Sequence, residues 1–320
     1  MEHFYLLIMN NTKKVFFLVG PTCTGKSKVA IELVKKHPFE VINMDASTVY
    51  KNLDIGTDKP SKKILAQYVH HMIDIIDPDQ TFNVNFYCKT VEVIINQIIS
   101  KGKTPLIVGG TMMYFNRLLH GIDVLPERDN DEREFINYLK KTYDIRTIHN
   151  CLKFIDARSY DRINPNDSQR IERALEVYLI TGRPMSSFFT DHKILNGNFI
   201  NKVIFLLPKN RSSYHRKIRQ RTTKIFNDGL IREVVELKKK YHIDSQSQSM
   251  KSIGYRQTME YLDGKISESQ LYEKCLFATR QLAKRQMTWM RKYKPDLEIN
   301  IDHKSFVEIV DDIETNLHFG

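Results

Sequence analysis

The feature that most constrains this chain is the stretch Gly20-Pro-Thr-Cys-Thr-Gly25-Lys26-Ser27, which fits the pattern G-x-x-x-x-G-K-[ST] without a mismatch. An apolar run, Val15–Val19, precedes it, and a segment of helical character, Lys28–Lys36, follows it. The pattern forms a phosphate-binding loop when it joins a strand to a helix in this way. The chain is therefore expected to contain an α/β unit that holds phosphate groups.

Each residue type in this loop suits the binding of an anion. Gly20 and Gly25 let the backbone wrap closely, so that successive N–H groups and a helix N-terminus converge on phosphate oxygens. Lys26 adds a positive charge, and the Ser27 hydroxyl can hold Mg²⁺. The other loop residues are Pro21, Thr22, Cys23 and Thr24. The loop by itself leaves open which phosphates it holds.

Composition narrows the class of protein. Of 320 residues, 41% are hydrophobic and 27% are charged, as is ordinary for a folded soluble chain. No apolar run approaches the ~20 residues that a membrane span needs. The net charge of +11 fits a polyanionic partner such as nucleic acid, or merely a Lys-rich proteome. The four cysteines form no C-x-x-C pair, so neither a disulfide framework nor a zinc site is expected.

The stretch Met1–Met9 bears on localisation. It contains Glu2 and no basic residue ahead of a short apolar run. A secretory signal needs a positively charged segment before its apolar segment. A cytoplasmic protein is therefore expected.

Strand and helix signals alternate over the first ~120 residues. Phe39–Asp45 and Thr104–Gly110 have strand character, and the apolar spacing of Phe86–Ser100 between them is helical. This order predicts an α/β fold with a P-loop-type parallel sheet core and helices on both faces. Each strand ends in polar or glycine residues, at the edge where parallel sheets bind their ligands.

The pattern changes after Gly121. Helical periods follow a charged turn and run to about Pro184. The clearest helix is Ser168–Thr181, with Asp167 and Gly182 as its caps. Strand character returns at Asn201–Leu207. We expect a catalytic core at 1–121 and 196–320, interrupted by a helical insertion at 122–195.

Two long helical patterns lie downstream of the insertion. They span Ser212 to about Tyr241 and Ser267 to about Lys292, and the last ~25 residues have no clear pattern. The first carries a dense basic run, and the second carries basic residues with Trp289 and Tyr293 among them. Basic helices with interleaved aromatic residues favour RNA or an anionic cofactor over simple solubility.

Polar residues at strand ends are the first candidates for chemistry. Asp45 closes one strand and could hold Mg²⁺ through water, act as a general base, or simply form a turn. Thr111 follows Gly109-Gly110, where paired glycines allow close approach of a ligand or merely turn the chain. Asp54 is a weaker candidate in a loop that returns to the same edge.

The helix at Ser168–Thr181 offers a further basic surface. Arg170 and Arg173 are three residues apart and share one face, with Ile171 and Leu175 turned elsewhere. Such a face could bind a phosphate backbone or a base edge, or it could be an ordinary solvated face.

Taken together, these segments resemble the tRNA dimethylallyltransferases, also called tRNA isopentenyltransferases. The match runs in order from about residue 15 to residue 292, and several motifs are specific to that family. The matching segments are 20–27, 45–50, 53–57, 109–111, 164–170, 253–257, 278–286 and 288–289. Because Cys and His form no cluster that could build a zinc finger, the chain resembles the compact bacterial form.

The resemblance implies a reaction. A five-carbon prenyl group would pass from dimethylallyl diphosphate to the N6 amine of the adenosine on the 3′ side of the anticodon. The phosphate loop, Gly20 to Ser27, would then hold the diphosphate with Mg²⁺, and Arg221 would stabilise it as it leaves. Asp45 matches the catalytic aspartate, and Thr111 matches the threonine near the reacting centre.

The resemblance also implies how tRNA is bound. The adenosine would flip out of the anticodon loop, the insertion would clasp the anticodon stem, and a single copy of the chain would act. The residues expected to contact tRNA are Asp45, Ala46, Ser47, Thr48, Thr111, Arg133, Gln169, Arg170, Ile171, Glu172, Arg173, Lys284 and Arg285. Ala46, Thr48 and Lys51 depart from the family's usual serine, glutamine and arginine, which bears on how the tRNA loop is recognised.

Two other functions fit these residues less well. A P-loop kinase of a small molecule or nucleoside would leave the segments Gly109–Thr111 and Ile253–Gln257 unexplained. An RNA-binding protein with a vestigial site would have no need of intact Lys26, Asp45 and Thr111. The transferase is therefore the favoured function.

Overall fold

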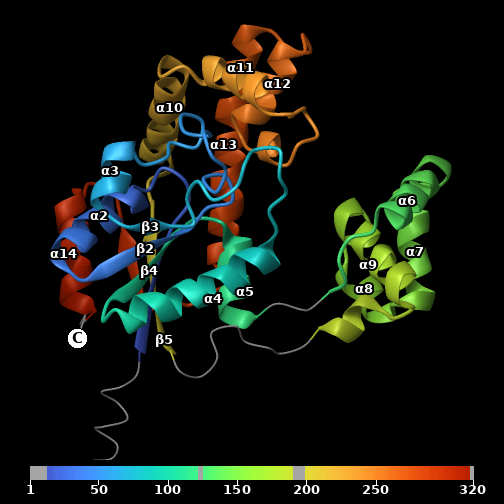
Figure 1. The fold of residues 1–320 in the computed structure, drawn as a ribbon, viewed down its shortest axis with the longest axis horizontal. Coiled ribbons are helices and arrows are strands. Elements are labelled where there is room, and N and C mark those ends of the chain that lie inside the picture. The colour runs from blue at the N-terminus through green and yellow to red at the C-terminus, as the bar shows by residue number, and fades with distance from the viewer. Residues whose placement is uncertain (1–12, 122–124, 190–198, 318–320) are drawn as a thin grey trace, which may run out of the picture. The chain divides into compact units, whose positions relative to one another are not determined.

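The computed structural model describes residues 13–121, 125–189 and 199–317, so the expectation about Met1–Met9 lies outside the described residues. The chain divides into two units (Figure 1). Unit 1 comprises Met1–Leu119 with Leu195–Gly320, and unit 2 comprises His120–Ile194. Across the described ranges, no helix has the length and hydrophobicity that a membrane crossing requires.

Unit 1 is built on a parallel sheet whose six described strands lie in the order β3-β2-β4-β1-β5-β6. The strands are β1 (Lys13–Val19), β2 (Phe39–Met44), β3 (His70–His71), β4 (Thr104–Gly109), β5 (Phe199–Leu207) and β6 (Leu297–Asn300). In register, Val19 pairs with Gly109, and Gly109 pairs with Met44. The residues that follow β1, β2 and β4 therefore emerge side by side at one edge of the sheet.

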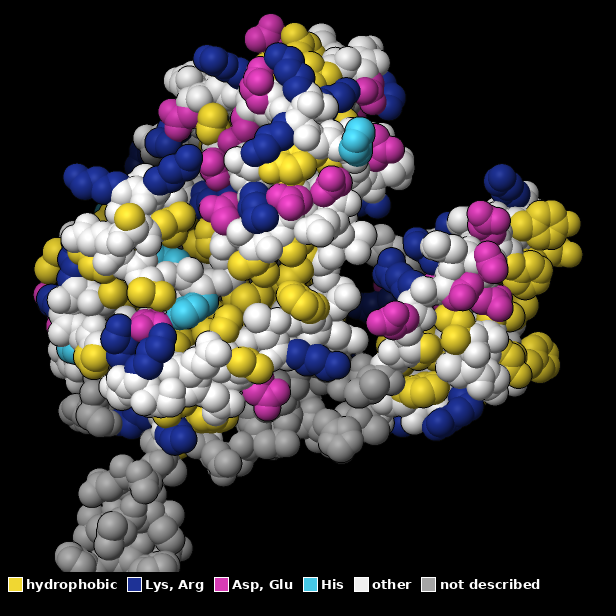
Figure 2. Space-filling model, in the orientation of Figure 1, with side chains coloured by type: hydrophobic (Ala, Val, Ile, Leu, Met, Phe, Trp, Pro, Cys, Tyr) yellow, Lys and Arg dark blue, Asp and Glu magenta, His cyan; other side chains and the backbone are white. Residues whose placement is uncertain are grey.

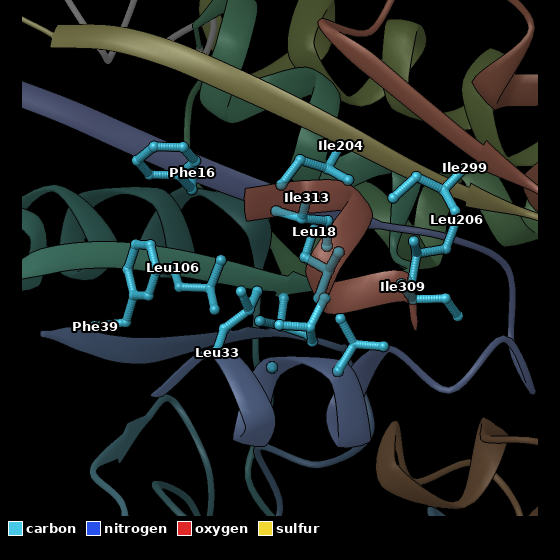
Figure 3. Packing of buried hydrophobic residues seen from close by; sticks show 14 of the residues in the cluster. Phe16, Leu18, Leu33, Phe39, Leu106, Ile204, Leu206, Ile299, Ile309 and Ile313 are labelled. Carbon is cyan, nitrogen blue, oxygen red and sulfur yellow. The ribbon is translucent and has the colours of Figure 1, made fainter. Parts of the chain in front are cut away.

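One face of the sheet is covered by α2 (Lys26–Lys36) and α14 (Phe306–Asn316). Leu33 of α2 and Ile313 of α14 are buried in one cluster with strand residues such as Leu18 and Leu106 (Figure 3). Full burial of one such side chain is worth ~1.5–3 kcal/mol. The last ~25 residues, in which no pattern was recognised, thus supply both an edge strand and a core helix.

The opposite face carries α4 (Val84–Ser100) and α5 (Met112–His120). Phe115 of α5 contacts the rings of Phe17 and Phe205 edge-on, with centroids 5.6 and 6.1 Å apart. Successive strand residues point to opposite faces, so Phe16 and Phe17 serve different cores. The predicted fold class, a parallel sheet with helices on both faces, is confirmed.

The prediction of one long helix from Ser212 to about Tyr241 is wrong. The pattern at Ser212–Tyr241 is two helices, α10 (Arg211–Asn227) and α11 (Leu230–Lys240), separated at Gly229. Gly229 has φ +104, a left-handed conformation that an α-helix does not contain. The second pattern, by contrast, forms α13 (Glu268–Met290), close to its expected bounds. The remaining helices of unit 1 are α3 (Lys62–Gln67) and α12 (Tyr255–Leu262), with a 3₁₀ turn at Ser249–Lys251.

The described part of unit 2 is helical. It contains α6 (Asn130–Thr142), α7 (Ile145–Ile155), α8 (Ala157–Arg162), α9 (Ser168–Thr181) and a 3₁₀ turn at Met185–Phe188. Both predicted caps of α9 are confirmed: the Asp167 carboxylate accepts from the Arg170 N–H at 3.2 Å, and Gly182 has φ +68. Ile136, Leu152 and Ile171 are buried in its small core.

Candidate active site

The phosphate loop joins β1 to α2 and has a left-handed backbone at Cys23 and Gly25. At Gly25, with φ +83, a Cβ atom would lie 2.5 Å from the ring of Phe306 at the start of α14. Lys26 Nζ donates to the carbonyl oxygen of Pro21 at 2.8 Å, so the side chain is folded back across the loop. Thr24 Oγ1 donates to the same oxygen at 2.9 Å.

Helices from the second half of unit 1 hold this loop through Thr22. Tyr214 of α10 donates its hydroxyl to the Thr22 carbonyl oxygen at 2.6 Å. Gln286 of α13 accepts from the Thr22 N–H at 2.9 Å and donates to the Gly110 carbonyl oxygen at 2.8 Å. One buried amide therefore joins the phosphate loop to the segment that follows β4.

Asp45 and Thr111 lie together where β2 and β4 end. The Asp45 carboxylate accepts from the Ser47 N–H at 2.8 Å, so the aspartate does form a turn. Thr111 Oγ1 accepts from the Ala46 N–H at 3.2 Å, and the Thr111 N–H donates to the Met44 carbonyl oxygen at 3.3 Å. These bonds fix Thr111 against the residue next to Asp45.

Arg221 of α10 bridges the phosphate loop and the loop after Leu53. Its guanidinium donates to Thr22 Oγ1 at 3.0 Å, to the Thr57 carbonyl oxygen at 3.0 Å and to the Asp58 carboxylate at 3.1 Å. Three bonds to neutral and acidic oxygens orient the charge firmly. The side chain is thus held beside the phosphate loop, while its expected role toward a leaving diphosphate stays a prediction.

Most of these groups line one cavity in unit 1, although Thr111 and Tyr214 are not among its lining residues. Its volume is about 700 Å³, within the range that holds a small molecule. The phosphate loop from Thr22 to Ser27 lines it, together with Asp45, Arg221 and Gln286. Burial lowers the pKa of Lys26 to about 8, against the opposing pull of the Asp45 and Cys23 charges. This value already includes a small lowering by the Arg221 charge, and two cations this near each other favour a bound anion.

The oxygen donors in the cavity fit Mg²⁺. Ser27 is exposed at the start of α2 and lines the cavity with Asp45. Mg²⁺ is commonly held by one or two carboxylates together with substrate phosphates. In the described part of the chain, no cluster of three or more His, Cys, Asp or Glu could hold a metal unaided. The residues therefore suit a metal ion that arrives with a phosphate ligand.

The predicted tRNA-contacting residues of unit 1 differ in exposure. Lys284 and Arg285 are exposed on α13, and Ser47 lines the cavity. Thr48 is buried, and its hydroxyl accepts from the Asn43 amide at 2.7 Å. Thr48 therefore has a clear structural role inside the unit.

The predicted tRNA-contacting residues of unit 2 also differ in exposure. Gln169, Arg170 and Arg133 are exposed, whereas the Ile171 side chain is buried in the core. Arg173 is committed within the unit: it bonds the Glu176 carboxylate at 2.6 Å and the Pro126 carbonyl oxygen at 2.5 Å. Glu172 accepts from Ser168 and pairs with Lys140. Arg133 and Arg170 are thus the exposed cations of this set.

The charge of the surface is not gathered into one patch on the face drawn in Figure 2, where Lys and Arg are interspersed with Asp and Glu. Many of these cations are paired, for example Lys224 with Asp228 at 2.5 Å and Lys274 with Glu260 at 3.1 Å. The net charge of +11 therefore does not by itself mark a binding surface.

Several site residues were not predicted. Gln286 lies in a matching motif that indicates no role for it, and no sequence pattern marks Tyr214, Asp58 or Phe306. Gln286 and Thr22 are 264 positions apart in the chain, a contact that no local pattern reports. The motif itself, a glutamine at the end of a basic helical run, was the available signal for Gln286.

Comparison with protein families gives two matches along the chain. The model described as IPP transferase matches residues 48–293, and the model described as isopentenyl transferase matches residues 13–74. Among individual proteins, the chain is 42% identical over 277 residues to a tRNA dimethylallyltransferase of Nitrosomonas europaea, covering 86% of this chain and 87% of the relative. It is 40% identical over 288 residues to that of Francisella tularensis subsp. novicida, covering 90% and 94%.

The chain is also similar to solved structures of tRNA-modifying transferases. A tRNA isopentenylpyrophosphate transferase from Bacillus halodurans has a TM-score of 0.68 and 29% identity, covering 95% of this chain and 96% of that one. The corresponding enzyme of Staphylococcus epidermidis has a TM-score of 0.65 and 32% identity, and the match covers 94% of this chain and 98% of that one. A eukaryotic dimethylallyltransferase, described as acting on tRNA, has a TM-score of 0.76 and 25% identity, and the match covers 95% of this chain and 76% of that one.

Proposed function

This chain belongs to the IPP transferase family, and on that premise we propose that it transfers a dimethylallyl group from dimethylallyl diphosphate to N6 of the adenosine 3′-adjacent to the anticodon. Family membership makes it a transferase that prenylates tRNA. The observation that carries the finer assignment is the shared cavity of the phosphate loop, Asp45 and Arg221. It brings an anion site and a carboxylate base to one edge of the sheet.

In the proposed reaction, the lone pair of N6 forms a bond to C1 of the dimethylallyl group. The bond from C1 to the diphosphate oxygen breaks, and its electron pair leaves with diphosphate. Asp45 takes the proton that N6 loses, as the exocyclic amine is a poor nucleophile without a base. Thr111 lies far from Asp45 in the sequence, but its hydroxyl accepts from the N–H of the neighbouring Ala46, and from there it would help to orient Asp45 and the acceptor.

Negative charge develops on the leaving diphosphate, and fixed positive groups stabilise it. The loop N–H groups, the Lys26 amine and the Arg221 guanidinium would supply that charge, and hydrogen bonds already hold both side chains at the phosphate loop. Mg²⁺, held by Ser27 and the diphosphate, would add a further positive charge when bound. In this scheme the loop holds the diphosphate leaving group in the place where other phosphate loops hold a nucleoside triphosphate.

Transfer requires adenine to leave the stacked anticodon loop and enter the cavity. We assign tRNA binding to the exposed cations Lys284 and Arg285 of unit 1 and Arg133 and Arg170 of unit 2. We also propose that a monomer is active, as the family resemblance implies, with unit 2 binding the anticodon stem-loop.

The test is product analysis of unmodified tRNA incubated with the protein, Mg²⁺ and dimethylallyl diphosphate. Mass spectrometry of the nucleosides should find an adenosine heavier by one dimethylallyl group, and sequencing of the digest should place it beside the anticodon. A parallel reaction with adenosine triphosphate is the control. Consumption of the triphosphate with no prenylated adenosine would favour the kinase instead.

A further inference from the structure

One carboxylate behind the cavity gathers an unusual number of donors. Glu233 of α11 accepts from the N–H groups of Asp54 and Ile55 at 3.0 and 2.7 Å with one oxygen. Its other oxygen accepts from the Gly56 N–H at 3.2 Å and from the Tyr255 hydroxyl at 2.6 Å. Three successive backbone amides therefore converge on one negative charge, as in an anion-binding nest.

Tyr255 of α12 completes this arrangement. Its side chain is fully buried, and its oxygen also accepts from the Gly56 N–H at 3.1 Å. A Cβ atom at position 56 would lie 2.5 Å from the Tyr255 ring, so only glycine fits there. Burial and the neighbouring Glu233 charge raise the pKa of Tyr255 well above its usual value, which keeps the hydroxyl protonated as a donor.

The loop held in this way leads directly to the diphosphate site. The residues that follow Gly56 are Thr57 and Asp58, and both accept from the Arg221 guanidinium. Arg221 in turn donates to Thr22 of the phosphate loop. Gly56, Thr57 and Asp58 line the cavity, whereas Glu233 and Tyr255 are not among its lining residues.

We propose that Glu233 and Tyr255 are positioning residues for the diphosphate: they hold the loop at 54–56 so that Thr57 and Asp58 fix Arg221 against the phosphate loop. These roles rest on the proposed function, since it assigns the diphosphate to this loop. This role gives a physical reason for the tyrosine in the family motif Ile253–Gln257. Because Glu233 occupies the three loop amides, they are also withheld from phosphate.

The experiment compares Glu233→Gln and Tyr255→Phe with the control Glu236→Gln, an exposed glutamate on the same helix that pairs with Lys239. Calorimetry measures the Kd for inorganic diphosphate with Mg²⁺, and filter binding measures the Kd for tRNA. The Kd for diphosphate should rise about tenfold in Glu233→Gln, or about 1.4 kcal/mol, and less in Tyr255→Phe. The Kd for tRNA should stay within about twofold of wild type.

A double-mutant cycle with Arg221→Ala separates positioning from general stability. If Glu233 acts through Arg221, Glu233→Gln should change diphosphate affinity little once Arg221 is gone. Full additivity, or a folded Glu233→Gln protein with wild-type diphosphate affinity, would overturn the assignment. Should Glu233→Gln fail to fold, Tyr255→Phe removes a single oxygen and carries the same cycle, with unchanged affinity again overturning it.

Failure of this inference can be told apart from failure of the proposed function. Diphosphate binding is measured without any transfer, so it reports on Glu233 whatever the acceptor is. Absence of prenylated tRNA from the wild-type reaction, with diphosphate still bound through Arg221, would count against the proposed reaction alone. Prenylation with no effect of Glu233→Gln on diphosphate would count against the positioning role alone.

Discussion

At the scale of single residues, the site depends on charged groups whose neighbours set their behaviour. Lys26 is folded onto the Pro21 carbonyl oxygen, and Arg221 is held by three acceptors. Asp45 uses one carboxylate oxygen to turn the chain at Ser47. A structural bond of this kind orients a base without consuming both of its oxygens.

Replacing Asp45 with asparagine tests the proposed base. Asp45→Asn keeps an acceptor for the Ser47 N–H, so the turn should survive while proton transfer is lost. Single-turnover transfer should slow by at least ~10²-fold, on the usual scale for a general base. The Kd for tRNA should be nearly unchanged. Transfer at the wild-type rate would remove Asp45 from the mechanism.

The lowered pKa of Lys26, about 8, predicts a pH dependence of diphosphate binding. Below that pH the free protein carries the charged amine, and above it the amine is increasingly neutral. Affinity for diphosphate should therefore fall between about pH 7 and pH 9. Lys26→Arg keeps its charge over this range and corrects for titration of diphosphate itself. Equal slopes for the two proteins would show that Lys26 does not titrate there.

At the scale of elements, the site is assembled by helices that come from distant parts of the chain. α10 supplies Tyr214 and Arg221, α13 supplies Gln286, and α14 places Phe306 beside Gly25. α14 is further tied to the end of α2 by the pair His37 and Glu314 at 2.7 Å. The C-terminal helix thus braces the helix that follows the phosphate loop.

The break between α10 and α11 gives a prediction about backbone conformation. A Cβ atom at Gly229 would meet nothing within 4 Å, so any cost of alanine there comes from its φ of +104 alone. Gly229→Ala should lower the free energy of unfolding by ~1–2 kcal/mol. Gly182→Ala, also without a steric contact and at φ +68, is the matched variant in unit 2. Increased stability, measured by urea unfolding, would mean that the two helices can become one.

At the scale of the whole molecule, the chain is divided into two compact units, and we propose that unit 1 carries the chemistry while unit 2 contributes to tRNA binding. Unit 1 contains the cavity and all the groups proposed for diphosphate. Unit 2 has its own core and exposes cations as well as aromatic side chains, Tyr138 on α6 and Phe154 on α7 among them. Such a division predicts that binding of the two substrates can be weakened separately.

Arg170 provides that test. Its side chain is exposed on α9 and pairs only loosely with Asp167, at 3.4 Å. Arg170→Ala should weaken tRNA binding and leave the Kd for diphosphate unchanged, as measured by filter binding and calorimetry. Arg158→Ala, an exposed arginine of α8, controls for the loss of one positive charge. A loss confined to diphosphate would show that unit 2 has been assigned the wrong substrate.

Local signals predicted much of the architecture. The phosphate loop, strands β1, β2, β4 and β5, and the caps of α9 all follow from patterns within about ten residues. Predictions failed where the pattern was ambiguous: apolar spacing ran through Gly229, and β6 and α14 were too short and mixed to stand out. Tertiary packing determines the structure of these segments. The α14 helix is stabilised mainly because Ile309 and Ile313 are buried against the sheet.

The sequence by itself indicated the chemistry through its family resemblance, with the loop glycines, Lys26, Ser27, Asp45 and Thr111 as the residues proposed to perform it. The sequence also predicted that those groups lie at one edge of the sheet, because the carboxyl ends of parallel strands share an edge. Only the tertiary structure decided how the groups are oriented. Arg221 meets Thr22 across 199 positions, and Glu233 meets Ile55 across 178. Such contacts arise from the packing of whole helices, and a linear pattern of residues does not encode which side chains that packing brings within hydrogen-bond distance.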